Sequence, residues 1–286
     1  DLFFFHLKKK KKIYYPFIFI LFYNYICSLC MGDFVAYKNL IRGFKNMDFN
    51  SYNHITNSND GSYTISPIAD IYTNFSEKFG IPRQSGLAPC RGRIVFRNNY
   101  RTRDAIKGLG YFSHIWVIWS FSENIDKKKT PTVRPPKLGG NEHVGVFSTR
   151  SPFRPNNLGL SSLRLESIDY DDPSGPVLIV SGVDMLNGTP IFDIKPYIAY
   201  ADSHSNATGG FTDVLDLPNF NIQVSDEIGK KIPYELRDEI YSLLRLNPRP
   251  GYQNDPNRIY GMSYAGMNIS FSVQGNTITI TNIERL

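Results

Sequence analysis

The chain has 286 residues, and 32 Lys or Arg against 26 Asp or Glu give it a formal net charge of +6. This length allows one large domain or two smaller ones with cores of their own, and the charge permits a polyanionic partner without requiring one. Three cysteines exclude a disulfide framework, which makes a reducing compartment the default.

The first thirty residues join a lysine run, Lys8–Lys12, to an apolar stretch, Ile13–Cys27. Five lysines against Asp1 account for +4 of the net charge of +6, which leaves +2 for all other residues. One interpretation is a basic-flanked signal anchor, which would give an organellar or membrane-anchored form. We favour the other interpretation, upstream sequence read in frame, because the chain opens at Asp1 and its first methionine is Met31. No membrane partner is then expected.

A polar segment follows, in which Asn, Ser, Asp and Gly dominate from 45 to 62. We therefore predict a low-complexity, flexible N-terminal extension over residues 1–62, with regular structure from Tyr63. Cys27 and Cys30 within it form a C-x-x-C pair. A structural zinc site needs four ligands and no second pair follows, so no metal site is predicted.

Residues 63–207 are predicted to form a β-rich domain whose longest apolar run is Tyr111–Phe121. This run favours a strand buried on both faces. His114 within it is predicted to be a satisfied core histidine, and His143 a solvated surface histidine. The aromatic residues of the run are expected in the core: Tyr111, Phe112, Trp116 and Trp119.

Three shorter runs are further strand candidates, and loops rich in Pro, Gly and Asn separate them: Arg93–Arg97, Leu160–Leu165 and Val177–Val183. Many short strands with such punctuation favour a barrel or a sandwich over alternating βαβ units. We therefore expect a mainly β fold.

Residues 208–286 are predicted to form a small C-terminal α+β domain. Pro233 stands at a first helical position and apolar residues follow at helical spacing. The helix must end by Asn247, because the next residue is proline and disfavours helical geometry before it. Met267–Val273 and Ile278–Ile283 flank a Gly-Asn turn and predict a terminal β-hairpin.

Generic catalytic signatures are absent from the sequence, which has no G-x-S-x-G, Walker loop or H-E-x-x-H. Gly108-Leu-Gly110 precedes an aromatic strand instead of opening a helix after one, so it is not a dinucleotide fingerprint. A nucleoside cofactor, if the protein uses one, must therefore be bound by an architecture other than a Rossmann fold.

Four segments in a fixed order are unusual enough to identify a family: Gly80-Ile-Pro-Arg-Gln84 with Gly86, Pro131–Asn141, Gly145–Asn156 followed by Gly159, and Asp184–Pro190 leading to Asp193–Tyr197 and Ala201-Asp202. In order and spacing they resemble the TrmO family of tRNA adenosine-N6 methyltransferases, also called TsaA-like proteins. A fifth segment, Asn247–Tyr252 before Tyr260-Gly261, is similar to the family's smaller C-terminal domain. The resemblance covers Tyr63–Leu286.

The resemblance implies a single-sheet β-barrel that binds S-adenosylmethionine, carries a small C-terminal α+β domain, and forms a homodimer in the cytoplasm. The implied reaction is N6-methylation of N6-threonylcarbamoyladenosine next to the anticodon of tRNA, at position 37. Carried over residue by residue, the implied cofactor contacts are Pro82, Arg83, Gln84, Ser122, Glu123, Arg150, Leu160, Leu186, Asn187 and Gly188.

Asp193 and Asp202 are the candidates for a general base in the implied reaction, with Lys195 steering a phosphate or carboxylate. Arg134 and Arg154 are either anchors for tRNA phosphates or loop-fixing ion pairs, since both uses suit a guanidinium. Other candidates for contacts with tRNA are Arg249 and the tyrosines of polar loops, which an unpaired base can reach: Tyr197, Tyr252 and Tyr260.

Three positions depart from the family pattern. The family has Pro-Ile where this chain has Asn157-Leu158, a change expected to be benign. It has Asp at the positions of Asn187 and Asn247, so a polar cofactor contact and tRNA docking are in question. The rival hypothesis is therefore a catalytically silent barrel that binds S-adenosylmethionine or RNA as a sensor or adaptor.

Overall fold

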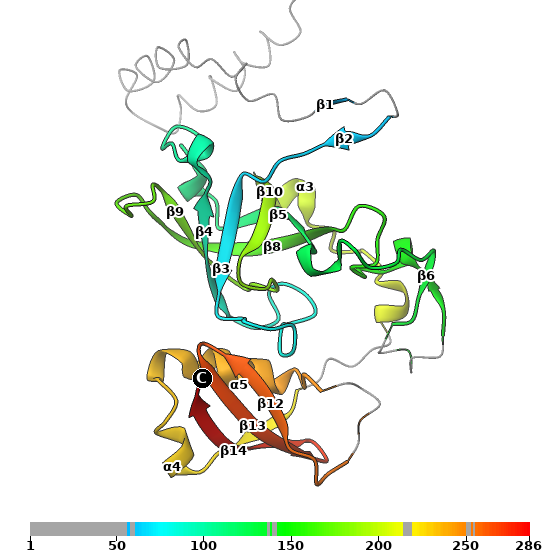
Figure 1. Cartoon of the computed structure of the whole chain (residues 1–286), viewed down its shortest axis with the longest axis vertical. Coiled ribbons are helices and arrows are strands. Elements are labelled where there is room, and N and C mark those ends of the chain that lie inside the picture. The colour runs from blue at the N-terminus through cyan, green and yellow to red at the C-terminus, as the bar shows by residue number, and fades with distance from the viewer. Residues whose placement is uncertain are drawn as a thin grey trace, which may run out of the picture. The chain divides into compact units, whose positions relative to one another are not determined.

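The computed structural model describes residues 56–57, 61–135, 138, 142–213, 219–249, 253 and 255–286 (Figure 1). Cys27, Cys30 and most of the predicted N-terminal extension lie outside these residues, as does Tyr252. Two short strands, β1 (Thr56–Asn57) and β2 (Tyr63–Thr64), come first in the described part. No helix there is long and apolar enough to cross a membrane.

Six antiparallel strands close into a barrel in the order β10-β3-β4-β9-β8-β5. Because a closed barrel has no free edge, every strand has two hydrogen-bonded neighbours. The barrel confirms the mainly β fold and the strands expected near Arg93, Leu160 and Val177. The strands are β3 (Ala69–Thr73), β4 (Arg91–Phe96), β5 (His114–Ser120), β8 (Leu158–Asp169), β9 (Val177–Ser181) and β10 (Thr189–Pro196).

The prediction that the Tyr111–Phe121 run is buried on both faces is wrong. In β5, Ile115 and Val117 are fully buried, whereas Trp116 and His114 between them are only partly buried. A barrel strand turns alternate side chains to the interior and to the exterior, so an unbroken apolar run does not imply two buried faces.

The expected core aromatics of this run divide accordingly. Trp119 is 6% exposed and belongs to the core, as predicted. Tyr111 is 93% exposed and Phe112 is 38% exposed, so their assignment to the core was wrong. Both precede β5, because the chain enters it through the 3-10 helix η4 (Leu109–Tyr111).

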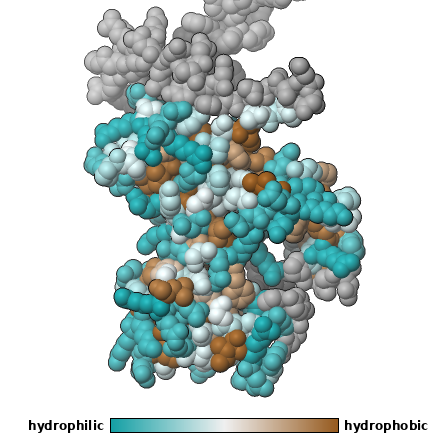
Figure 2. Space-filling view, viewed as in Figure 1, coloured by the Kyte–Doolittle hydropathy of each residue, from teal (hydrophilic) through white to brown (hydrophobic). Residues whose placement is uncertain are grey.

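Short elements connect the barrel strands or follow β10, the last of them. They are η3 (Asn98–Tyr100), η5 (Ser122–Asn124), β6 (Thr132–Val133), β7 (Val144–Gly145), η7 (Val146–Ser148), α3 (Ala199–Asp202) and η8 (Gly210–Thr212). β6 and β7 pair as a small antiparallel sheet outside the barrel. The surface in the view of Figure 2 is mainly hydrophilic, with apolar residues in small separate patches.

The C-terminal region forms a four-stranded sheet in the order β11-β14-β13-β12. The predicted helix and terminal hairpin are both present, with Pro233 as the N-cap of η9 and the hairpin turn at Gly275-Asn276. Asn247 takes a φ of +51° just beyond the end of the helix. The elements are β11 (Asn221–Gln223), α4 (Asp226–Gly229), η9 (Tyr234–Leu236), α5 (Arg237–Arg245), β12 (Tyr260–Tyr264), β13 (Met267–Gln274) and β14 (Thr277–Arg285).

Strand β12 packs against the long loop that connects β3 to β4. The ring of Tyr264 lies 5.0 Å from that of Phe75, and the backbone N–H of Ser263 donates to Glu77 Oε1 at 3.0 Å. Tyr264 also donates its hydroxyl proton to the buried carboxylate of Glu239 on α5. Burial raises the pKa of the neighbouring Cys90 thiol to about 12, so this cysteine stays a neutral core residue. Barrel and C-terminal sheet therefore share one continuous core.

Candidate active site

The loop between β3 and β4 carries the first predicted cofactor motif. Pro82 in it is buried, Arg83 is exposed and Gln84 is partly buried. The loop closes onto the segment after β9, because the N–H of Gly86 donates to the carbonyl of Gly182 at 2.9 Å. A Cβ on Gly182 would lie 3.1 Å from that nitrogen, and its φ of +80° also favours glycine. The approach of these two backbones fixes the position of Gln84.

Arg150 joins the third motif to this loop. Its Nη1 donates to Gln84 Oε1 at 2.5 Å, across 66 residues of sequence. The guanidinium itself remains exposed, and its positive charge also acts on the carboxylate of Asp184. Two residues predicted to hold the cofactor are therefore in direct contact, with donor groups still facing outward.

Asp184 was part of a recognised motif but was not predicted as a site residue. It accepts a hydrogen bond from Ser161 Oγ at 2.7 Å and one from the backbone N–H of Ser85. Trp119 Nε1 donates to the same Ser161 oxygen at 3.0 Å. The indole lies over Gly159, where a Cβ would come within 2.3 Å of the ring. This explains the glycine that closes the third motif.

Burial raises the pKa of Asp184 from 3.8 to about 6, against its hydrogen bonds and the nearby Arg150, which lower it. The chain Trp119–Ser161–Asp184–Ser85 therefore places a carboxyl of near-neutral pKa directly behind Gln84. Strand alternation alone predicts that Ser161 points inward. No local signal identifies its partners, because the four residues of this chain come from four separate segments.

The turn after β9 lies against β3. The N–H of Thr73 donates to Asn187 Oδ1 at 3.0 Å, and the N–H of Gly188 donates to the carbonyl of Ile71 at 2.8 Å. Gly188 has a φ of +77°. An asparagine supplies the same side-chain acceptor as an aspartate here, so the hydrogen bond to Thr73 does not depend on the family's carboxylate.

Ser122 and Glu123 lie in η5, just past β5. Lys78 of the β3–β4 loop reaches this element and donates to the carbonyl of Glu123 at 3.4 Å. The N–H of Asn187 also donates to the carbonyl of Phe75 in this loop at 2.9 Å. The structure therefore ties η5, Arg150 and the turn at Leu186–Gly188 to one loop. Leu160 is the exception among the predicted cofactor contacts. It is 56% exposed, and it alternates with Ser161, which points to Asp184.

The predicted catalytic residues gather around the outer side of β5. Lys195 and Asp193 form an ion pair of 3.1 Å on β10. Asp202 accepts hydrogen bonds from the backbone N–H of Ile198 at 2.8 Å and from Trp116 Nε1 at 3.0 Å, and these bonds lower its pKa. Asp202 therefore holds the turn that begins α3.

Two further aromatic residues complete this outer cluster. The ring of Tyr197 lies 5.6 Å from Trp116 and 6.1 Å from His114. His114 bonds Ser113 Oγ through Nδ1 at 2.9 Å, so it is satisfied as predicted, but on the outer side of the strand. Trp116, expected in the core, is therefore a partner of the stacking candidate Tyr197.

The predicted tRNA contacts have different surroundings. Arg154 donates to the carbonyls of Thr149 at 2.6 Å and Val146 at 3.3 Å, which makes it a residue that fixes its own loop. Arg134 is exposed and donates to His143 Nε2 at 2.9 Å. Arg249 lies 6.0 Å from the ring of Phe220. Tyr260, expected to be accessible to a base, is 6% exposed, because it faces the core of the C-terminal sheet.

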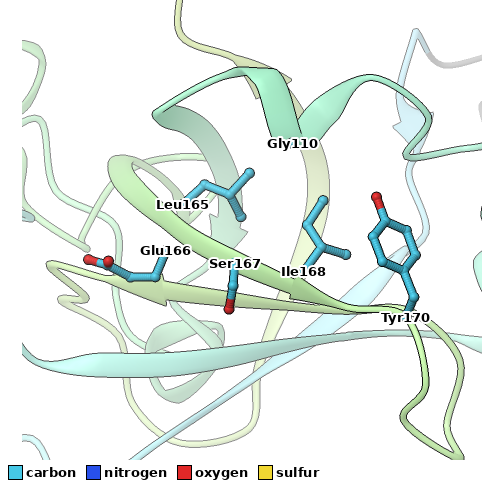
Figure 3. Close-up of a pocket in the computed structure, with 6 residues that line it drawn as sticks. All are labelled: Gly110, Leu165, Glu166, Ser167, Ile168 and Tyr170. Atoms are coloured by element: carbon cyan, nitrogen blue, oxygen red, sulfur yellow. The ribbon is translucent and has the colours of Figure 1, made fainter.

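A pocket of about 160 Å³ lies beside the bulge in β8 (Figure 3). Leu165, Ile168 and Tyr170 point toward Gly110 in this view, and Glu166 points away. Ligand pockets usually measure roughly 300 to 1,000 Å³, so this one is too small for a nucleoside cofactor. Among the described residues, no group of three or more His, Cys, Asp or Glu is arranged to hold a metal ion.

The cluster around Gln84 suits a ligand that carries both a negative and a positive charge. Arg150 offers a guanidinium to a carboxylate, Gln84 has an amide for hydroxyl or ring nitrogen edges, and Asp184 contributes negative charge. S-adenosylmethionine offers a matching group to each of these side chains: a carboxylate, the polar edges of a ribose and an adenine, and a positive sulfonium.

Comparison with known proteins gives consistent matches. The model of the tRNA-methyltransferase O N-terminal domain matches residues 70–203, and that of the TrmO C-terminal domain matches residues 218–286. The chain is 38% identical over 210 residues to RcsF of Pseudomonas aeruginosa, provisionally named as an S-adenosylmethionine-dependent methyltransferase. This match covers 70% of the chain and 88% of that protein.

A second relative and a solved structure agree. The chain is 33% identical over 220 residues to the tRNA (adenine(37)-N6)-methyltransferase of Escherichia coli K12, covering 74% of the chain and 92% of that protein. The crystal structure of TrmO from Pseudomonas aeruginosa superposes with a TM-score of 0.63 at 30% identity. The superposition covers 78% of this chain and 98% of the solved chain.

Proposed function

The chain belongs to the tRNA-methyltransferase O family, and from that membership we propose that it methylates the N6 nitrogen of N6-threonylcarbamoyladenosine at position 37 of tRNA. The coarser activity follows from the family: the protein is an S-adenosylmethionine-dependent tRNA adenine-N6 methyltransferase. The catalytically silent adaptor is not favoured, since relatives matched over most of their length are named as enzymes.

The observation that carries the proposal is the contact between Gln84 and Arg150, backed by Asp184. These residues come from three of the motifs, and the fold brings them together without a Gly-rich strand-to-helix turn. We assign the cofactor to this cluster, with Arg150 on its carboxylate and Gln84 on its ribose or adenine edge. Pro82 restricts the backbone of this loop, and Gly86 allows its positive φ of +78°.

Bound S-adenosylmethionine supplies an electrophilic methyl carbon on a sulfonium, so the transfer is an in-line displacement that depends mainly on positioning. The residues of this chain contribute that positioning. The bond between Arg150 and Gln84 holds both side chains at the end of the loop, and Asp184 fixes the loop from behind through Ser85. Ser161 and Trp119 in turn orient Asp184.

An N6 nitrogen that carries a carbamoyl group is a weak nucleophile, because its lone pair is delocalised. Its proton is correspondingly more acidic, so a general base assists the reaction. Asp193 and Asp202 remain the candidates for this base. The two N–H donors on Asp202 make it the weaker base of the two, so Asp193→Asn should reduce the rate more than Asp202→Asn.

The proposal is tested with methyl-labelled S-adenosylmethionine and two preparations of one tRNA, with and without the threonylcarbamoyl group. We expect label only in the threonylcarbamoylated tRNA. Equal labelling of both would overturn the substrate assignment, and no label in either, despite cofactor binding, would overturn the enzymatic activity.

Variants of the cluster test the assignment of the site. Arg150→Ala and Gln84→Ala should each weaken cofactor binding, by roughly tenfold or more for the charged contact. Arg285→Ala is a matched control, since it removes an exposed arginine on β14. Cofactor affinity unchanged by Arg150→Ala would exclude this cluster. We also propose that the protein acts in the cytoplasm and forms a homodimer. Sedimentation of the purified protein would test the oligomeric state.

A further inference from the structure

Outside the lysine run near the N-terminus, two segments carry most of the positive charge of the chain. Residues 91–107 contain six Lys or Arg against one Asp or Glu, but Arg93, Arg97 and Arg103 among them form ion pairs with aspartates. Residues 126–157 contain seven Lys or Arg against two Asp or Glu, a net charge of +5 in a chain whose total is +6. Residues 158–213, which supply β8, β9 and β10, contain two Lys or Arg against eight Asp or Glu. A mild overall charge therefore conceals a strongly basic segment beside an acidic one.

We call residues 126–157 the basic arm. Its described part includes the β6–β7 sheet and η7, and in Figure 1 this part extends away from the barrel strands around β6. Lys129 closes its base, donating to the carbonyls of Asn124 and Ile125 at 3.0 Å and to the side chain of Asn157. Asn157 is buried and bonds the carbonyl of Pro152 at 2.9 Å. Both ends of the basic arm are thus fixed to the barrel.

Four other described cations of the basic arm are exposed to solvent. Lys127, Lys128, Arg134 and Arg150 are all exposed, and Lys127 and Lys128 stand next to each other beside the fixed base. Exposed cations gathered on a rigid support are the usual means by which proteins hold a phosphate backbone.

The basic arm also presents an aromatic ring. Phe147 in η7 is 77% exposed, although an apolar ring gains nothing from contact with water. The guanidinium carbon of Arg154 lies 5.9 Å from its centroid, and the hydrogen bonds of Arg154 to Thr149 and Val146 keep that guanidinium in place. Exposed rings supported by arginine are stacking platforms for unpaired bases.

We propose that the basic arm is the surface on which RNA docks, with Lys127 and Lys128 on phosphates and Phe147 stacked on an unpaired base. This inference rests on the proposed function, because it locates the tRNA that the function requires. Arg150 connects the two: it belongs to the basic arm and bonds Gln84 of the cofactor loop. An RNA bound along the basic arm would therefore extend to the proposed cofactor site.

The test measures RNA binding without cofactor, so it is independent of catalysis. Two labelled probes are titrated by fluorescence anisotropy: the anticodon stem-loop of an unmodified tRNA, and a blunt RNA duplex of equal length. The double variant Lys127→Ala/Lys128→Ala should weaken binding of both and reduce the slope of log affinity against log salt by about 1.5 to 2. Phe147→Ala should weaken binding of the stem-loop about tenfold or more and leave duplex binding unchanged, whereas Phe147→Tyr should keep it.

The C-terminal region offers matched controls. Lys230 and Lys231 are also adjacent and exposed, and Tyr234 is 84% exposed with the guanidinium of Arg237 at 5.8 Å. Lys230→Ala/Lys231→Ala and Tyr234→Ala should leave both affinities unchanged.

Three outcomes would overturn the proposal. RNA affinity unchanged in the arm variants would mean that the basic arm serves another purpose, such as contact with a protein. Equal losses in the control variants would mean that charge alone, without a particular surface, governs binding. A Phe147→Ala variant that loses duplex binding as much as stem-loop binding would exclude stacking. Failure of the methylation assay, in contrast, would leave these binding results unaffected and refute only the proposed function.

Discussion

Asp184 is the residue whose protonation the fold changes most clearly near neutral pH. Its pKa is raised to about 6 by burial, against 3.8 in an unfolded chain. The folded state therefore retains a proton that the unfolded state loses, so the free energy of unfolding falls as pH rises from about 4 to about 6. Two pKa units correspond to roughly 2–3 kcal/mol.

We expect Asp184→Asn to remove this pH dependence, because an amide does not ionise. Urea unfolding at about pH 4 and about pH 7 should show the variant gaining roughly 2–3 kcal/mol relative to the parent over that interval. The comparison cancels all other titrating groups. A difference between the two proteins that is the same at both pH values would show that Asp184 titrates normally.

Asn157 shows how one residue adapts a family motif to this chain. Its φ is +49°, its side-chain amide donates to the carbonyls of Pro152 and Asn124, and its Oδ1 accepts a hydrogen bond from Lys129. The family's proline fixes φ near −65°, so it does not fit this conformation. The departure from the family pattern, expected to be benign, is part of the structure that closes the basic arm.

Restoring the family residue should therefore destabilise this protein. We expect Asn157→Pro to lower the free energy of unfolding by about 3 kcal/mol or more. Asn157→Gly is the control, since glycine accepts a positive φ and loses only the side-chain bonds, at about 1–3 kcal/mol. Urea unfolding of both variants measures the difference. A proline variant at least as stable as the glycine variant would contradict the expectation.

At the scale of elements, the β3–β4 loop depends on contacts with the C-terminal sheet. Gly80 has a φ of +94°, and a Cβ there would lie 2.6 Å from Met262 Sδ on β12. The backbone of Ala265 also donates to the carbonyl of Asn74 at 3.0 Å. The sheet therefore supports the segment that presents Gln84.

Gly80→Ala should move this loop away from Met262 and weaken cofactor binding by roughly 10- to 100-fold, since small misplacements are costly. Gly108→Ala shares the backbone strain, with a φ of +87°, but its Cβ meets no atom within 4 Å. Calorimetric titration of both variants with S-adenosylmethionine separates the effect of the contact with Met262 from the effect of backbone strain. Equal affinities would exclude support by the sheet.

The elements that sequence predicted well carry local signals. The helix before Asn247 and the hairpin at Gly275-Asn276 follow from a proline, apolar spacing and a turn pair, all within a few residues. The burial of β5 was predicted wrongly, because an apolar run does not reveal that one face of a barrel strand is outside.

The candidate site likewise contains residues that local motifs predicted and contacts that they did not. Gln84 and Arg150 were recognised because each lies in a motif. The contact between them, and the chain from Trp119 through Ser161 to Asp184, join residues up to 66 positions apart. Such contacts depend on the closure of the barrel, which no local pattern contains.

At the scale of the whole molecule, the basic arm and the acidic barrel strands give the protein opposite charge on segments adjacent in sequence. The overall charge of +6 hides this arrangement, since five lysines near the N-terminus contribute most of it. Charge near a binding surface raises association rates and is screened by salt. The charge of each segment that ion pairs do not neutralise is therefore a better guide to the RNA surface than the total charge.

The continuous core predicts how the molecule unfolds. Phe271 on β13 is fully buried, and its C-terminal sheet shares one hydrophobic cluster with the barrel. The two tryptophans of the chain, Trp116 and Trp119, both lie in β5. Because packed units that share a core unfold together, tryptophan fluorescence in the barrel should report damage in the distant sheet.

We therefore expect Phe271→Ala to lower the free energy of unfolding by about 3–5 kcal/mol, and to shift the transitions seen by tryptophan fluorescence and far-ultraviolet circular dichroism equally. Phe271→Leu, which keeps most of the buried volume, should shift both together by less. A fluorescence transition that stays in place while circular dichroism becomes biphasic would mean that the barrel folds independently. Support of the Gln84 loop by β12 would then be weaker than the shared core implies, because that support requires the sheet to stay folded whenever the barrel is.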